Sequence, residues 1–196
     1  MAFFLPLCPD VGRAAFAVFE LLILSRMTRR DAVFQLESQL VKTLENILID
    51  DDNPFSQLTI AFEFDYQAGR VDIIGTNAHG ELFGFEAKLA RWRSAVHQAY
   101  RNTAFTHFSY VVLPSPAAKN ALRWRYEFER RGVGLCSVDL EEIVIEIPAS
   151  KKTPFQPWLT NNAMEYIREE MFQSSVVGGT CCRLPPHPLT SPLLTN

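Results

Sequence analysis

The fold is decided by two neighbouring stretches of sequence, Arg70-Val71-Asp72-Ile73-Ile74 and Glu81-Leu82-Phe83-Gly84-Phe85-Glu86-Ala87-Lys88-Leu89. A segment rich in turn-forming residues, 77–80, separates them, so they predict two strands joined by a short turn. Side chains alternate along a strand, so Glu86 and Lys88 share the face opposite to the phenylalanines. Burying two charges is costly unless they are paired or bind an ion.

Asp72 makes the charged face of these strands more unusual. It stands among β-branched apolar residues, where a lone aspartate is disfavoured. The short turn allows Asp72 and Glu86 to converge, and two adjacent carboxylates repel each other unless a cation lies between them. Mg²⁺ is the cation that such oxygen ligands usually hold. A structural salt bridge or an exposed edge strand is the alternative explanation of these charges, and it stays open at this point.

The pattern around the two strands predicts an α/β sandwich with a mixed central sheet flanked by helices. We expect helices at 31–49, 91–106 and 117–131, and strands at 58–66, 70–75, 81–89, 109–113 and 133–138, with 143–147 as a further candidate strand. The order is a helix, an antiparallel three-strand meander, and then helices that alternate with strands.

Three parts of the chain differ in composition. Residues 1–28 are an apolar N-terminal extension with a candidate helix over 12–27, and Met27 is an alternative start of the protein. Residues 29–172 carry the regular α/β pattern. Residues 173–196 are rich in proline and glycine and predict a flexible tail. The apolar extension is a candidate surface for a homodimer or for a specificity partner.

Composition restricts the class of protein. The 196 residues are 47% hydrophobic and 21% charged, which fits one folded domain. No apolar run is long enough for a membrane span, and four cysteines without paired spacing exclude a disulfide framework. We therefore expect a cytoplasmic protein. The net charge of −3 hides an asymmetry, because 31–86 holds eleven acidic and two basic residues and 88–131 holds nine basic and two acidic ones.

The ordered set of polar residues resembles the core of the PD-(D/E)xK nuclease superfamily, which has the restriction-endonuclease-like fold. Asp72 is followed thirteen residues later by the start of the segment Phe85-Glu86-Ala87-Lys88, a preceding helix carries Glu37, and the following helix carries Gln98. The resemblance covers roughly residues 30–140 and most of the predicted topology.

The resemblance implies a metal site. In such a site Asp72 and Glu86 bind Mg²⁺, or Mn²⁺ as a substitute, and the backbone carbonyl of Ala87 adds a ligand. Glu37 would hold a water molecule or a second metal ion. Its position beside the apolar stripe of its helix allows it to reach the sheet, but a solvated helix glutamate is the alternative, and Glu45 is the second choice for this role.

The resemblance also implies the roles of two further catalytic residues. Lys88 would orient the attacking water and stabilise the transition state, and Gln98 would help to place the lysine or the phosphate. For Gln98, a surface amide without a catalytic role remains an equal alternative.

Basic residues after the third strand are candidates for binding the phosphates of DNA. These nucleic-acid-binding candidates are Arg91, Arg101, Lys119 and Arg123. Charged runs are more often simply solvated helix faces. Trp124 and Tyr126 lie among the basic residues, and we expect them to pack their helix on the sheet.

The residues therefore predict a Mg²⁺-dependent nuclease that hydrolyses phosphodiester bonds in DNA, and more specifically an endonuclease. The alternative is a catalytically silent module with a nuclease-like fold that binds nucleic acid or a protein partner. Retention of all three of Asp72, Glu86 and Lys88 favours the enzyme. The sequence does not distinguish restriction, repair, junction resolution and mobile-element roles, and it does not indicate specificity.

Overall fold

A computed structural model describes residues 34–178 of the chain, except residues 51, 56 and 68. Its centre is one six-stranded sheet with the order β1-β2-β3-β4-β5-β6. β1, β2 and β3 form an antiparallel meander, β3, β4 and β5 run parallel, and β6 returns antiparallel. The strands are β1 (Thr59–Asp65), β2 (Arg70–Thr76), β3 (Leu82–Ala87), β4 (Phe108–Pro114), β5 (Gly134–Val138) and β6 (Ile143–Ile147).

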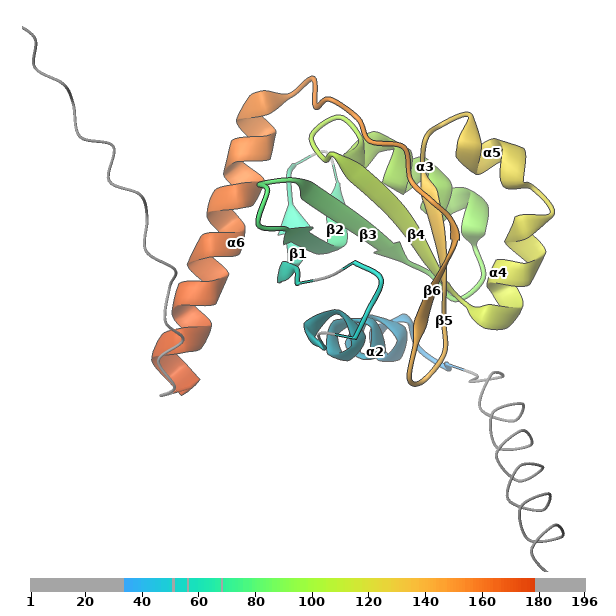
Figure 1. Cartoon of the computed structure of the whole chain (residues 1–196), viewed down its shortest axis with the longest axis horizontal. Helices are drawn as coiled ribbons and strands as arrows, with labels where there is room; N and C mark the ends of the chain where they lie inside the picture. The colour runs from blue at the N-terminus through green and yellow to red at the C-terminus, as the bar shows by residue number, and fades with distance from the viewer. Residues whose placement is uncertain (1–33, 51, 56, 68, 179–196) are drawn as a thin grey trace, which may run out of the picture.

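Helices cover both faces of this sheet (Figure 1). One face packs against α2 (Glu37–Ile49), which contributes Leu40, Leu44 and Leu48 to the core. The opposite face packs against α3, α4 and α5, since the crossovers between the parallel strands place their helices there. These helices are α3 (Trp92–Asn102), α4 (Ser115–Leu122) and α5 (Arg125–Glu129). The expected α/β architecture with a mixed central sheet is therefore confirmed.

The last helix, α6 (Pro157–Gly178), packs beside β1 and β2. The sequence predicts no element over 157–172 and a flexible tail from residue 173. The helix instead continues to Gly178, because no proline or glycine interrupts the chain between Pro157 and that residue. The rest of the tail and the extension 1–28 lie outside the described residues.

Two other helix predictions need correction. The first helix was expected from residue 31, but it begins at Glu37, where the Gln39 side chain accepts hydrogen bonds from the backbone N–H groups of Gln35 and Leu36. The expected helix 117–131 is two helices, because Trp124 leaves the helical conformation, with φ −115° and ψ 30°. The first difference concerns the start of a helix and the second adds a helix between β4 and β5, so the order of the strands is unchanged.

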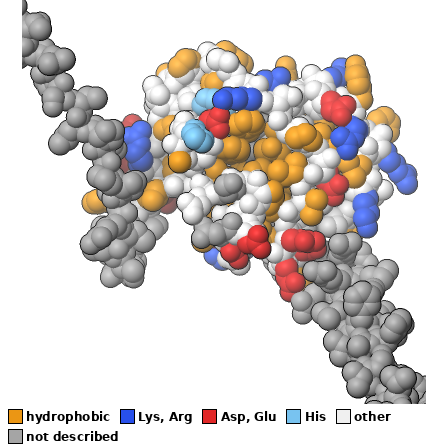
Figure 2. Space-filling model, in the orientation of Figure 1, with side chains coloured by type: hydrophobic (Ala, Val, Ile, Leu, Met, Phe, Trp, Pro, Cys, Tyr) orange, Lys and Arg blue, Asp and Glu red, His pale blue; other side chains and the backbone are white. Residues whose placement is uncertain are grey.

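The distribution of side chains follows the layers (Figure 2). In that view, hydrophobic side chains gather across the middle of the sheet face above α2, and acidic side chains gather near α2. Lys and Arg side chains are prominent along the edge where α4 and α5 lie. Within the described part of the chain, no helix is both long enough and apolar enough to cross a membrane.

Candidate functional site

The candidate site is built where β2 and β3 stop pairing through their backbones. Their antiparallel pairing runs from Thr76 opposite Leu82 to Ile73 opposite Phe85. Just beyond it, the Asp72 carboxylate accepts a hydrogen bond of 2.8 Å from the backbone N–H of Ala87. A side chain therefore holds the end of β3, and this fixes the position of the Asp72 carboxylate beside the next residue, Lys88.

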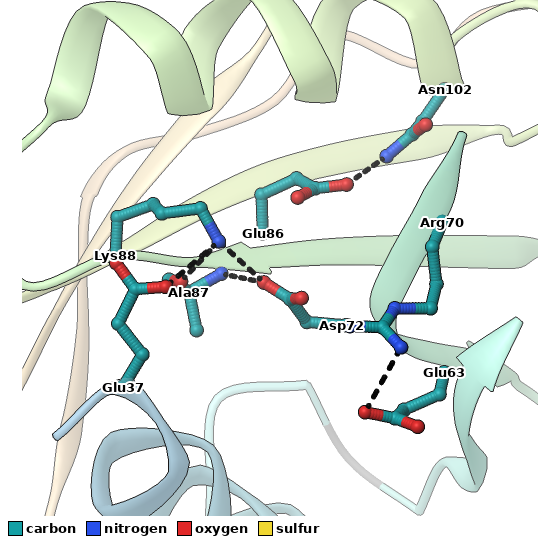
Figure 3. A network of polar contacts seen from close by, with 8 residues as sticks. All are labelled: Glu37, Glu63, Arg70, Asp72, Glu86, Ala87, Lys88 and Asn102. Atoms are coloured by element: carbon teal, nitrogen blue, oxygen red, sulfur yellow. Dashed lines mark hydrogen bonds and ion pairs between the residues drawn. The ribbon is translucent and has the colours of Figure 1, made fainter. Parts of the chain in front are cut away.

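The Lys88 ammonium is surrounded by three acceptors. Its Nζ lies 3.3 Å from Asp72 Oδ2, 3.3 Å from Glu37 Oε2 and 3.0 Å from the Ala87 carbonyl oxygen. Figure 3 shows Glu37 and Asp72 approaching the ammonium from opposite sides. Burial lowers the pKa of Lys88, but the two carboxylates together outweigh burial, and the pKa ends above its ordinary value. The ammonium therefore stays charged, and its single positive charge is shared between Asp72 and Glu37.

Glu86 has a different environment from the other two carboxylates. It is only 1% exposed, and its Oε1 accepts a 2.7 Å hydrogen bond from Asn102 Nδ2 on α3. Its second oxygen, Oε2, is buried and has no hydrogen-bond partner among the described residues. Burial, reinforced by the charge of Asp72, raises the pKa of Glu86 to about 8. This carboxyl group is consequently mostly protonated at neutral pH.

The sequence analysis expected Lys88 and Glu86 to point to the same face of the sheet. In the structure, Lys88 bonds to Asp72 and to Glu37 of α2, and Glu86 bonds to Asn102 of α3. The charges of Asp72 and Lys88 both act on the pKa of Glu86. Lys88 itself lies just beyond the end of β3 at Ala87.

Asn102 and Tyr66 belong to the site, although the sequence analysis did not identify them. Asn102 is fully buried, and its Oδ1 accepts a 3.1 Å hydrogen bond from the Tyr66 hydroxyl while its amide nitrogen donates to Glu86. The hydroxyl thus fixes which end of the amide faces Glu86. Asn102 lies four residues after Gln98, on the same face of α3, and that spacing was an available signal for it.

The remaining catalytic candidates, Glu37 and Gln98, lie on helices α2 and α3. Glu37 is half exposed and joins the site through Lys88, whereas Glu45 forms an ion pair of 2.6 Å with Lys42 instead. The side-chain oxygen of Gln98 is buried without a hydrogen-bond partner within the described ranges. Arg101 follows on α3, and its charge acts on Glu86 by lowering that carboxyl group's pKa.

Of the other basic candidates, Arg91 and Arg123 are exposed at the ends of α3 and α4. Lys119 lines a pocket of about 220 Å³ together with acidic residues of the β5–β6 region, so its charge faces carboxylates. The expectation that Trp124 and Tyr126 pack their helix on the sheet is wrong. Their exposed fractions are 49% and 69%, because the buried aromatic residue of α5 is Phe128.

The site has a buried carboxylate oxygen, Oε2 of Glu86, that a divalent cation could bind. The described residues contain no group of three or more His, Cys, Asp or Glu side chains that could hold a metal ion. The groups that could hold a cation are the carboxylates of Asp72 and Glu86 and the Ala87 carbonyl, which now accepts a hydrogen bond from Lys88. The buried Oε2 of Glu86 needs a partner, and hard oxygen donors are the ligands that Mg²⁺ prefers.

No family model matches this chain, and no curated protein matches it. Among solved structures, the chain is similar to the SPO1766 protein of unknown function from Silicibacter pomeroyi. The two share 15% sequence identity and a TM-score of 0.46, over 61% of this chain and 80% of that chain.

Proposed function

We propose that this protein is a metal-dependent nuclease that hydrolyses phosphodiester bonds in DNA as an endonuclease, on a restriction-endonuclease-like fold. The observation that carries the proposal is the pair of carboxylates at the ends of β2 and β3. One of them, Glu86, keeps a buried oxygen without a partner, and a lysine ammonium lies beside the other, Asp72.

The electrostatics of this pair favour cation binding. Placing Glu86 in the core next to Asp72 raises its pKa to about 8, so the ionised form is disfavoured until positive charge is supplied. A divalent ion held by Asp72, Glu86 and the Ala87 carbonyl would supply that charge, and it would act as a Lewis acid toward phosphate oxygens and bound water. Asn102 would hold Glu86 in the orientation that leaves Oε2 available.

Lys88 supplies the second part of the chemistry. Phosphodiester hydrolysis gathers negative charge on the phosphoryl oxygens, and a preorganised ammonium in a partly dry site stabilises that charge. Lys88 remains protonated, and its longest contacts are the two ion pairs of 3.3 Å. Glu37 is the more exposed of the two partners. Release of Glu37 would therefore free one ammonium proton to bind the attacking water or a phosphate oxygen.

The order of elements also supports this proposal. The hairpin of β2 and β3 carries Asp72 and Glu86, and the crossover through α3 to β4 brings Asn102 to Glu86. The same arrangement would allow a DNA backbone to reach the ends of β2 and β3 from the side of Glu37. Arg91, Arg101, Lys119 and Arg123 remain the candidates for phosphate contacts at its margin.

A cleavage assay tests the proposal. Plasmid, linear duplex, single-stranded and branched DNA are offered with Mg²⁺ or Mn²⁺ to the wild type, to Lys88→Ala and to Lys151→Ala. Lys151 is the matched control, because it also forms a lysine–glutamate pair, with Glu81, but outside the site. We expect cleavage by the wild type and the control that a chelator abolishes, and at least about 100-fold slower turnover for Lys88→Ala.

Two results would contradict the proposal. Equal cleavage by the wild type and a folded Lys88→Ala protein would remove the lysine from the mechanism. The absence of cleavage on every substrate, with DNA binding retained, would favour the catalytically silent binding module instead. Circular dichroism of each variant verifies that the comparison is made between folded proteins.

A further inference from the structure

A series of stacked aromatic rings runs from the core to the surface between α3 and α5. Phe128 is fully buried, and its ring stacks on Trp92 with centroids 5.8 Å apart and planes 25° apart. Trp92 in turn stacks on Trp124, at 6.0 Å and 30°. Trp124 ends the series and is half exposed, so a large apolar ring that is held in place from below meets solvent.

Unpaired positive charge surrounds the outer rings. The Arg93 guanidinium carbon lies 4.3 Å from the Trp92 ring centroid and 4.8 Å from that of Trp124. Within the described ranges, Arg93 has no carboxylate partner, and neither do Arg91 and Arg123, which border the two tryptophans in sequence. Other arginines of this region differ in this respect.

Three neighbouring arginines, by contrast, form ion pairs with carboxylates. Arg125 pairs with Glu129, and Arg130 and Arg131 both pair with Glu127. Arg91, Arg93 and Arg123 have no such carboxylate among the described residues. A small pocket of about 110 Å³ opens beside the indoles, and its lining includes both tryptophans, Arg93, His97 and the paired Glu127 and Arg131. Arg93 is the arginine of this lining that no carboxylate neutralises. A ligand that complements the pocket combines a flat aromatic ring with negative charge.

We propose that Trp92, Arg93 and Trp124 form a stacking platform for an unpaired base of single-stranded nucleic acid, with Arg91 and Arg123 contacting the flanking phosphates. Bases stack on exposed aromatic side chains regardless of their identity, and an arginine beside the ring adds cation–π attraction. A duplex keeps the faces of its bases covered, so the platform distinguishes single strands or frayed ends from intact duplex.

This inference rests on the proposed function and specifies its substrate. Arg91 and Trp92 follow Lys88 by three and four residues, at the end of β3 where the candidate site lies. A strand whose base stacks on the platform would have its backbone guided by Arg91 toward that site. The platform therefore assigns single-stranded or partly unpaired nucleic acid as the substrate class.

The test measures binding of a labelled single-stranded oligonucleotide and of the same strand in a duplex by fluorescence anisotropy. The full chain is used in the presence of a chelator, so no cleavage is needed. The variants are Trp124→Ala, Trp124→Phe and, as the matched control, Trp158→Ala, since Trp158 is also an exposed tryptophan but lies on α6. Because Trp124 is at the surface, the substitutions leave the buried Phe128 in place.

We expect the wild type to prefer the single strand and Trp124→Ala to weaken single-strand binding about tenfold. Trp124→Phe should retain most of the affinity, the control should equal the wild type, and duplex binding should not respond to either change at Trp124. Equal single-strand binding by wild type and Trp124→Ala would overturn the inference, as would preference for duplex or the absence of any binding. Metal-dependent cleavage without this binding would support the proposed function and overturn the stacking platform. Single-strand binding that depends on Trp124, without cleavage, would support the platform and contradict the proposed function.

Discussion

Replacing Glu86 by glutamine should stabilise the metal-free protein at pH 8 and change its stability little at pH 4.5. The reason is that the folded protein holds the Glu86 carboxyl group in the core, 1% exposed, with only one of its oxygens hydrogen-bonded among the described residues. Its pKa is about 8 in the folded protein and about 4.5 when the group is in water. Glutamine keeps the size of the side chain but cannot ionise.

The sign and size follow from proton linkage. Between pH 4.5 and pH 8 the folded state keeps the proton on Glu86 and the unfolded state loses it, so the free energy of unfolding falls as the pH rises. The stabilisation is fully present below pH 4.5 and is lost by about pH 8. At about 1.4 kcal/mol per pH unit, the total loss approaches about 5 kcal/mol, a large part of a domain's stability.

The assay is urea unfolding of the full chain with a chelator present, at a series of pH values from 4.5 to 8. Glu165→Gln is the matched control, because it is the same substitution at an exposed glutamate of α6. We expect the stability difference between Glu86→Gln and wild type to grow with pH and the control to follow the wild type. Parallel pH profiles for the wild type and Glu86→Gln would refute the reasoning.

Three further predictions concern the support of the site and the core, each measured by urea unfolding. Tyr66→Phe removes the hydrogen bond to Asn102 Oδ1 and should cost about 1–2 kcal/mol, whereas an unchanged midpoint would show that the hydroxyl does not hold the amide. Leu44→Ala opens a cavity under the sheet and should cost about 2–5 kcal/mol, and a cost below that range would mean that α2 packs loosely. Gly134→Ala should destabilise the protein, because a Cβ there meets the Tyr110 ring, and wild-type stability would show that the ring moves freely.

Local patterns in the sequence predicted most of the sheet. The alternating residues of β2 and β3 and the apolar runs of β4 and β5 located these strands, and the candidate strand 143–147 is β6 with the same bounds. The pattern of α6 is also present in the sequence, with Leu159, Ala163 and Ile167 four residues apart and all buried. Pro154 and Pro157 precede it, and prolines are typical of turns and loops.

Long-range contacts account for what the sequence did not predict. The break between α4 and α5 lies at Trp124, which stacks on Trp92, thirty-two residues earlier in the chain. Asn102 depends likewise on Tyr66, whose hydroxyl reaches it from the end of the β1–β2 hairpin. Neither partner is visible to a pattern read along one element.

The sequence pattern likewise predicts some features of the candidate site and not others. The strand pattern identified Asp72, Glu86 and Lys88, and the helix pattern placed Glu37 at the edge that reaches Lys88. The pattern does not predict that Asn102 is the partner of Glu86, or that the Asp72 carboxylate accepts a hydrogen bond from the Ala87 N–H at the end of β3. A pattern of residue types gives no information about that bond.

The central claim is that Asp72 and Glu86 form a divalent-cation site, and calorimetric titration of Mn²⁺ into the chelator-free protein at pH 7 tests it most directly, without a choice of substrate. Since Glu86 is mostly protonated at that pH, the account predicts one binding event that releases up to about one proton, which the dependence of the enthalpy on the buffer measures. Glu86→Gln and Asp72→Asn should lose this binding. Absence of binding to the wild type, or the same binding by both variants, would contradict the account.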